Sequence, residues 1–460
     1  MRARDPQDRR TQGPAGAPRV VARAAALALA GALLAGAAGA QVGYPDPTWR
    51  DALATVRDAV RDTAGHTADA GRLDALGAAL IRVARLADAE PVLRRALDQR
   101  PGDQEALAGL GRIALFRQRD TEAESLLAAA GGADGAAADL YRVRLRRHEW
   151  AAAAEMAESQ GEGGRRELLE RLAASPEVPP AGAERASLPF QRAWPVPLVR
   201  VKLNGQLVTM AVDFGSNELL LDPGATANCH VSIVPGERTV GWSGMRVAAR
   251  NAIAQKLELG GIVLAGVPAA VTPLHVYSLQ ANPEGPDLAG VIGLPVLEQM
   301  GVTIDFRRQE LELRRGGGYA AKGERVPFER WGENELVVYG SLAGGRRMAL
   351  WVGTGLPGAA LGAPHETFDE IGVQPGRVAN FVRSMGTLLQ GRPWSQVIVS
   401  TVTVGTMARD HVEGWSGAMD PADLWRWGVR RDAVLGPRFF ENRRVTFDWD
   451  RHELVFEEKN

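Results

Sequence analysis

The segment "VIGLPVLEQMGVTIDFRRQELEL" (residues 291–313) is repeated in altered form near the C-terminus as "VLGPRFFENRRVTFDWDRHELVF" (434–456). At an offset of 143 residues, nine of the 23 positions are identical. The shared residues of the first copy are Val291, Gly293, Glu298, Val302, Thr303, Asp305, Arg308, Glu310 and Leu311. So many identities at one offset indicate a duplication, and we expect the C-terminal half to consist of two copies of one β-rich lobe.

The duplication extends upstream of these segments. "VPLVRVKLNGQLVTMAVD" (196–213) has the alternating pattern of two strands joined by an Asn-Gly turn. The second strand ends in "TMAVDFG" (209–215), and "RMALWVGTG" (347–355) occupies the same place in the second lobe. Gly353 therefore stands opposite Asp213. A carboxylate at the end of a buried strand is costly unless it is used or paired, so Asp213 is a candidate functional residue.

These loops resemble those of the aspartic proteases, and the compact duplicated lobes are similar to the bacterial retropepsin-like group. The resemblance rests on the Asp213 loop, the Thr354-Gly355 loop, and the apolar-apolar-Gly elements 291–293 and 434–436. It implies an all-β bilobal fold, with lobe one at 191–316 and lobe two at 324–458. It also implies that the two loops meet between the lobes, beneath a hairpin flap that covers a cleft for an extended peptide.

The sequence departs from the family pattern in both loops. Lobe one keeps Asp213 but has Phe214 in place of the threonine, and lobe two keeps Thr354 but has Gly353 in place of the aspartate. Proteolysis in this family uses two carboxylates that share a proton, one as the base and one as the acid. We therefore predict a degraded dyad and a protein that binds extended peptides or partner proteins.

Two alternatives stay open. One is an active aspartic endopeptidase that pairs Asp213 with a rearranged or intermolecular carboxylate, and the other is a purely structural adaptor. Lobe two offers further carboxylates outside its loop, at Asp369, Asp410, Asp420 and Asp423. The resemblance assigns binding roles to loop residues Gly215, Ser216, Thr354 and Gly355.

The segments 241–250 and 383–394 are candidate flaps, and they contain Trp242 and Trp394. These tryptophans are candidates for contact with a peptide, although packing beneath their own hairpins is the simpler interpretation. Asp305 and Asp448 recur in both lobes, which favours a turn or strand-end role. No motif calls for a cofactor or a metal, since "HETFD" (365–369) lacks the second histidine of a zinc-binding helix.

The N-terminal half has a helical repeat. Six positions of the segment 73–101 recur with the same residue type 34 residues later. They are Leu73, Leu76, Gly77, Ala89, Leu93 and Ala96. This resembles the tetratricopeptide repeat, whose stacked helical hairpins hold peptides or partner proteins. We expect a helical domain at 41–165, with a capping helix at 46–61, and a linker at 166–190.

The extreme N-terminus and the composition restrict location and partners. Arginines up to Arg23 precede an apolar run that ends at Ala38-Gly39-Ala40, as in a signal peptide (1–40) cleaved after Ala40. We therefore expect a periplasmic or secreted protein, with no membrane association after cleavage. The charge balance of 54 basic and 55 acidic residues gives no reason to expect nucleic acid binding. A single cysteine, Cys229, excludes an intramolecular disulfide, and the sequence leaves the oligomeric state open.

Overall fold

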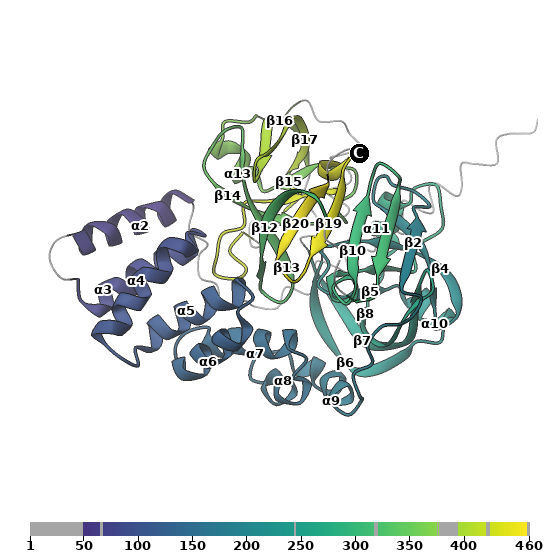
Figure 1. Ribbon diagram of the computed structural model, residues 1–460, viewed down its shortest axis with the longest axis horizontal. Helices are drawn as coiled ribbons and strands as arrows, with labels where there is room; N and C mark the ends of the chain where they lie inside the picture. The colour runs from purple at the N-terminus through teal and green to yellow at the C-terminus, as the bar shows by residue number, and fades with distance from the viewer. Residues whose placement is uncertain are drawn as a thin grey trace, which may run out of the picture. The chain divides into compact units, whose positions relative to one another are not determined.

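The computed structural model describes residues 49–64, 68–242, 245–316, 321–374, 376, 394–419 and 424–457 (Figure 1). The predicted signal peptide and its cleavage site lie outside these residues. Within them, no helix has the length and apolar character needed to cross a membrane. Helices fill the first part of the described chain and strands dominate the second, which confirms the predicted order of an α-helical region followed by a β-rich region.

The helical region is a series of short helices that pack pairwise. They are α2 (Trp49–Ala64), α3 (Ala70–Arg82), α4 (Leu86–Gln99), α5 (Gln104–Phe116), α6 (Asp120–Ala130), α7 (Ala136–Arg146), α8 (Trp150–Ala157), η1 (Gly163–Arg165) and α9 (Arg166–Ala173). Aspartates begin two of the equivalent helices. The side chain of Asp69 accepts a hydrogen bond from the Arg72 amide at 2.9 Å, and that of Asp103 accepts one from Glu105 at 3.2 Å.

The repeated glycines explain the 34-residue period. A Cβ atom on Gly77 would lie 2.3 Å from Cδ2 of Leu93, and one on Gly111 would lie 2.6 Å from Cγ of Leu127. In both hairpins the two helices therefore cross at a position where only glycine fits. Helical hairpins at this period are confirmed, while their membership of the tetratricopeptide family stays a prediction.

The β-rich region contains two sheets. The eight-stranded sheet has the order β1-β8-β5-β9-β4-β3-β7-β6. Its strands are β1 (Ala181–Gly182), β3 (Leu198–Leu203), β4 (Gln206–Val212), β5 (Leu219–Leu221), β6 (Ser232–Trp242), β7 (Met245–Leu259), β8 (Ile262–Val271) and β9 (Gly290–Ile292). Strands β3 and β4 form the predicted hairpin, and its turn residues Asn204 and Gly205 have φ of 47° and 86°. Positive φ at both central positions is the type I′ geometry that an Asn-Gly pair favours.

The twelve-stranded sheet has the order β14-β18-β15-β17-β16-β13-β12-β20-β19-β10-β11-β2. Its strands are β2 (Arg185–Pro189), β10 (Gly301–Asp305), β11 (Glu310–Arg314), β12 (Gly323–Trp331), β13 (Glu335–Leu342), β14 (Met348–Val352), β15 (Leu361–Ala363), β16 (Ser395–Val404), β17 (Met407–Ser416), β18 (Ala433–Leu435), β19 (Arg444–Asp448) and β20 (Glu453–Glu457). Short helices connect the strands: α10 (Pro223–Asn228), α11 (His275–Ala281), α12 (Leu294–Leu297), α13 (His365–Glu370) and η3 (Pro437–Phe440).

Strand pairing confirms the duplication. In lobe one β4 runs parallel to β9, with Val212 paired to Ile292, and in lobe two β14 runs parallel to β18, with Val352 paired to Leu435. Strands β10 and β19 then pair antiparallel, so that Thr303 lies opposite Thr446, its counterpart in the other copy. Their Oγ1 atoms are 2.6 Å apart. A residue that pairs with its own counterpart marks the local two-fold axis that relates the lobes.

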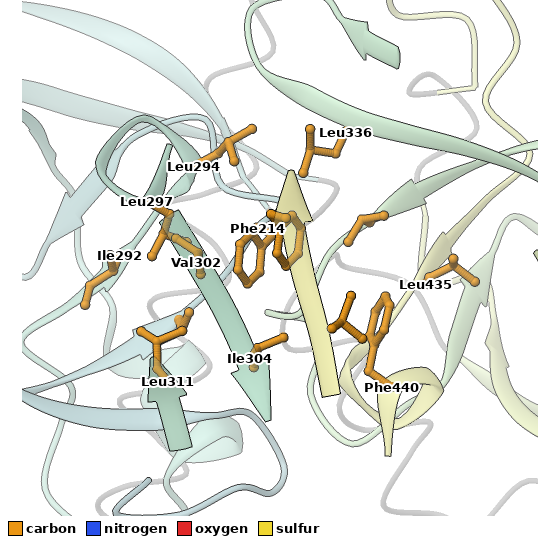
Figure 2. Close-up of a cluster of buried hydrophobic side chains, with 14 of the residues drawn as sticks. Phe214, Ile292, Leu294, Leu297, Val302, Ile304, Leu311, Leu336, Leu435 and Phe440 are labelled. Atoms are coloured by element: carbon orange, nitrogen blue, oxygen red, sulfur yellow. The ribbon is translucent and has the colours of Figure 1, made fainter. Parts of the chain in front are cut away.

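One hydrophobic core continues across this axis. Figure 2 shows side chains from both copies around Phe214, among them Ile304 from β10 and Leu435 from β18. The ring of Phe214 stacks on that of Phe447, with 3.9 Å between centroids. The lobes are therefore joined by apolar packing as well as by the β10–β19 ladder.

The structure differs from the predicted linker at 166–190. Helix α9 occupies its first residues and buries Leu168 and Leu169, and strand β2 occupies its last, with Leu188 paired to Leu311 of β11. The prolines at 176–180 suggested a flexible connection, but the residues on either side have partners far away in the sequence. Secondary structure that depends on such distant pairing is not visible in a local pattern.

Candidate active site

The Asp213 loop follows directly from strand β4, and the Gly353 loop follows directly from β14. The two loops touch: a Cβ atom on Gly215 would lie 2.8 Å from Cα of Gly353. A Cβ atom on Gly355 would lie 2.2 Å from Oδ2 of Asp213. Glycine at 215 and 355 therefore permits the close approach of the loops, and the loops predicted to meet between the lobes do so.

Backbone amides from both lobes hold the Asp213 carboxyl group. Its Oδ1 accepts hydrogen bonds from the amides of Gly215 and Gly355, each at 2.8 Å. The residue is only 2% exposed. Burial raises the pKa of Asp213 to about 6, and the two amides and the nearby indole N–H of Trp242 act in the opposite direction. The Trp242 N–H nevertheless lacks the geometry of a regular hydrogen bond.

The side chain of Thr354 links the two loops. Its hydroxyl donates to the carbonyl of Val212 at 2.9 Å and accepts from the amide of Phe214 at 3.1 Å. The counterpart hydroxyl is absent because Phe214 stands in its place and packs on Phe447. The two equivalent positions therefore differ, with a hydrogen-bonding hydroxyl in lobe two and an aromatic ring packed into the core in lobe one.

Ser216 lies within the loop and serves its shape. The residue is 1% exposed, and its hydroxyl donates to the carbonyl of Glu218 at 2.9 Å. Its carbonyl accepts from the amide of Leu294 at the start of α12. Both polar groups have partners inside the protein, so Ser216 connects the Asp213 loop to the element 291–293 beneath it.

The end of strand β6 and helix α11 lie close to the two loops. Trp242, 3% exposed, packs its ring edge-on against Tyr277 with 4.6 Å between centroids. The Tyr277 hydroxyl donates to the carbonyl of Gly355 at 3.0 Å. Trp242, the last residue of β6, is therefore buried against a residue that contacts the Gly353 loop, and the flap role of segment 241–250 stays a prediction.

Trp394 is also buried, at 1% exposure, and it belongs to an apolar cluster with Trp351, Trp415 and Val434 in lobe two. The rest of the second flap candidate, residues 383–393, lies outside the described residues. In this structure neither predicted peptide-contacting tryptophan is exposed.

A small pocket lies beside Asp213, between the Asp213 loop and the Gly353 loop. It has a volume of about 20 Å³, and its lining residues are Asp213, Gly215, Trp351, Gly353, Leu356, Ala418, Met419 and Val434. Such a volume holds about one water molecule. A Cβ atom at position 353 would lie 2.7 Å from Cγ2 of Val434, so even the first atom of an aspartate side chain requires Val434 to move.

Asp213 is the only acidic residue among those that line this pocket. Of the other lobe-two carboxylates, Asp369 is exposed on α13 and Asp410 is exposed on β17, where it accepts from Thr401. Asp420 and Asp423 fall outside the described residues. Across the part of the chain that the structure describes, no group of three or more His, Cys, Asp or Glu side chains is arranged to hold a metal ion.

Asp305 and Asp448 have the turn role that their recurrence predicted. Oδ1 of Asp305 accepts from the amides of Arg307 and Arg308 at 2.8 and 3.0 Å, and Oδ1 of Asp448 accepts from Arg451 at 3.1 Å. Both aspartates therefore close the hairpins that follow β10 and β19.

The sequence patterns did not identify three residues that lie near Asp213: Tyr277, Trp351 and Met419. The sequence could have identified Trp351, because it precedes Gly353 by two residues and occupies the position equivalent to Ala211 in the other lobe. Tyr277 and Met419 come from segments without a motif, and only the tertiary structure brings them to the loop.

The comparisons with known proteins agree with this geometry. Residues 199–296 match the aspartyl protease family. The match contains the Asp213 loop and the element 291–293, and the duplication relates lobe two to it. The β-rich region thus has an aspartic-protease-like fold.

Two solved structures are similar to this chain, basic 7S globulin from soybean and an aspartic proteinase from Irpex lacteus. Each is 12% identical, and each covers 60% of this chain. The shares of those chains that are covered are 95% and 98%, with TM-scores of 0.37 and 0.39. No curated protein sequence matches the chain.

Proposed function

We propose that this chain is an aspartic-protease-fold protein that has lost its catalytic dyad and binds extended peptides or partner segments. The observation that supports this most directly is Gly353 at the position of the second aspartate, facing a pocket whose other walls are apolar. Acid–base proteolysis needs one carboxylate as the base on water and a second as the acid toward the carbonyl. A buried aspartate that accepts only backbone hydrogen bonds supplies one of the two.

The sheet edge near Asp213 supports the binding role. Strand β6 lies at the end of the eight-stranded sheet, and its last residue is Trp242, whose indole N–H lies near the Asp213 carboxyl group. An edge strand offers backbone donors and acceptors to an added strand, which is how many domains hold extended peptides. Residues 238–242 would then supply the backbone contacts, and the pocket at Asp213 would select a side chain once its walls move apart, because in this structure it holds about one water molecule.

A peptide library tests both parts of the proposal. Wild type, Asp213→Asn and the control Asp369→Asn, which changes an exposed carboxylate of α13, are incubated with the library from acid to neutral pH. We expect peptides to be retained by all three proteins and no cleavage products in mass spectra. Cleavage by wild type that Asp213→Asn abolishes would show an active endopeptidase, and Asp420→Asn and Asp423→Asn would then identify the partner. If peptides are neither cleaved nor retained, the binding role is wrong.

A restored dyad provides a complementary test. The variant Gly353→Asp with Val434→Ala returns the missing carboxylate and removes the methyl group that stands 2.7 Å from the new Cβ. Two carboxylates in one site titrate in two coupled steps. We expect this variant to cleave retained peptides that wild type leaves intact. Retention without cleavage in a folded variant would mean that the site has lost more than one carboxylate.

We also propose that the protein acts outside the cytoplasm, as its N-terminal sequence predicts. Expression of the full chain in a bacterial host, followed by fractionation and N-terminal sequencing, tests this. A mature N-terminus at Gln41 in the periplasmic fraction is expected, and retention of residues 1–40 in the cytoplasmic fraction would contradict it.

A further inference from the structure

The segment 424–432 of lobe two, "LWRWGVRRD", is unusually deeply buried for a connection between strands. We call it the tryptophan segment. Leu424, Val429, Arg430 and Arg431 are each at most 1% exposed. Two hydrogen bonds close it into a turn, from the Gly428 amide to the Trp425 carbonyl and from the Arg431 amide to the Leu424 carbonyl, both at 2.8 Å. Connections between strands normally run over the surface, so a buried one must pack against another part of the chain.

The partner is the helical region. Arg82 is the last residue of α3, and its guanidinium lies 5.2 Å from the centre of the Trp425 ring. The backbone carbonyl of Arg82 also accepts a hydrogen bond from the Arg430 amide at 3.0 Å. Arg142 of α7 lies 4.8 Å from the Trp427 ring. Cations at these distances from an indole face attract it, and the attraction grows when water is excluded.

The middle hairpin contributes as well. Phe116 of α5 stacks on Trp331 of lobe two, with 5.3 Å between ring centroids. Leu424, Trp425 and Val429 belong to the same buried cluster as the apolar residues of α3 and α5. The first helices of three successive hairpins, α3, α5 and α7, therefore all contact lobe two, and the first and last of them contact the tryptophan segment.

The other end of the tryptophan segment reaches the Asp213 pocket. Arg431 forms a buried ion pair with Glu335 and lies 4.9 Å from the ring centre of Trp351. The chain continues from Asp432 into β18, where Val434 pairs with Trp351 of β14. Trp351 and Val434 both line the pocket. An uninterrupted series of described residues thus connects the helical hairpins to the wall of the site.

We propose that the helical hairpins are an in-chain receptor for the tryptophan segment, and that this docking holds the lobe-two wall of the Asp213 pocket in its closed position. The face of α3, α5 and α7 is then occupied by the protein's own chain and is not a free groove for a foreign peptide. Entry of a side chain beside Asp213 requires Trp351 and Val434 to move, and the docked segment opposes that movement. The effect on peptide binding rests on the proposed function, whereas the docking and its effect on the pocket do not.

Hydrogen exchange of the full chain tests the proposal. Trp427→Ala removes the ring that Arg142 contacts, and Arg142→Ala is the milder variant should the first fold poorly. The control Arg94→Ala changes an arginine of α4 that is half exposed and pairs with Glu90 and Glu122. We expect amides of β14 and β18 to exchange at least tenfold faster in Trp427→Ala than in wild type and in the control. Amides of β7 and β8 serve as an internal reference and should not change.

Two further readouts separate this proposal from the proposed function. In carboxyl NMR, water entry should move the pKa of Asp213 from about 6 toward its usual value in Trp427→Ala. Peptide affinity should rise at least threefold if peptides bind in the site. Faster exchange in the tryptophan segment alone, with β14, β18 and Asp213 unchanged, would overturn the proposal. Opening of the pocket without any peptide binding would overturn the proposed function and leave this proposal standing.

Discussion

The buried Asp213 should make the stability of this protein depend on pH, and Asp213→Asn should remove that dependence. In the folded protein burial raises the pKa of this carboxyl group from 3.8 to about 6. Below pH 3.8 it is protonated in both the folded and the unfolded states, and no free energy is lost. As pH rises from 3.8 to about 6, the unfolded state ionises first, so the contribution of Asp213 to stability is lost over this window.

The size of the effect follows from the two pKa values. A difference between 3.8 and about 6 corresponds to about 3 kcal/mol of unfolding free energy once both states are ionised. The linkage relation gives a loss of about 0.6 kcal/mol at pH 4, about 1.6 at pH 5 and about 3 at pH 8. Asparagine keeps an Oδ1 acceptor for the amides of Gly215 and Gly355, so both hydrogen bonds survive in Asp213→Asn.

Urea unfolding at these pH values, followed by tryptophan fluorescence, measures the difference. Asp213→Asn should exceed wild type by only about 0.6 kcal/mol at pH 4 and by up to about 3 kcal/mol at pH 8. Asp369→Asn is the control, because that carboxylate is exposed. A difference that does not grow with pH, or a variant less stable than wild type at pH 8, would refute the reasoning. Either result would mean that a nearby group stabilises the ionised Asp213 carboxylate in the folded protein, as an active site requires.

Two further pairs of variants test the packing around the hairpins and loops. Gly77→Ala should destabilise the protein by about 1–3 kcal/mol, since its Cβ would lie 2.3 Å from Leu93 Cδ2. Gly71→Ala is the matched control, because its Cβ would meet nothing closer than 3.6 Å, and it should be neutral or stabilising by up to about 1 kcal/mol. Thermal unfolding of both variants measures the difference. Thr354→Val should cost about 1–3 kcal/mol because the buried amide of Phe214 loses its acceptor, and Thr354→Ser should recover most of this in chemical denaturation. Equal stabilities within either pair would contradict the packing described here.

Sequence patterns predicted most of the architecture. The identities between 291–313 and 434–456 predicted two lobes, and they lead directly to the pairing of Thr303 with Thr446 across the local two-fold axis. The same alignment placed Gly353 opposite Asp213. The 34-residue period predicted the helical hairpins, because a glycine at a helix crossing is a local requirement that each copy must meet separately.

Patterns failed where structure depends on distant partners. The segment 166–190 was read as a linker, although α9 packs within the helical region and β2 pairs with β11. The tryptophan segment gave no signal at all. Its tryptophans and arginines acquire their role only from Arg82 and Arg142, which lie far upstream in the chain.

The sequence by itself determined that the β-rich region is duplicated and that Gly353 stands in the position equivalent to Asp213, because both are properties of aligned residues. The tertiary structure alone decided the state of the remaining carboxyl group. Its pKa depends on how much water reaches it, and Trp351, Met419 and Val434, from different parts of lobe two, line the small pocket beside it. The burial of this carboxyl group results from packing between segments that are distant in the sequence, so a local sequence pattern does not predict it.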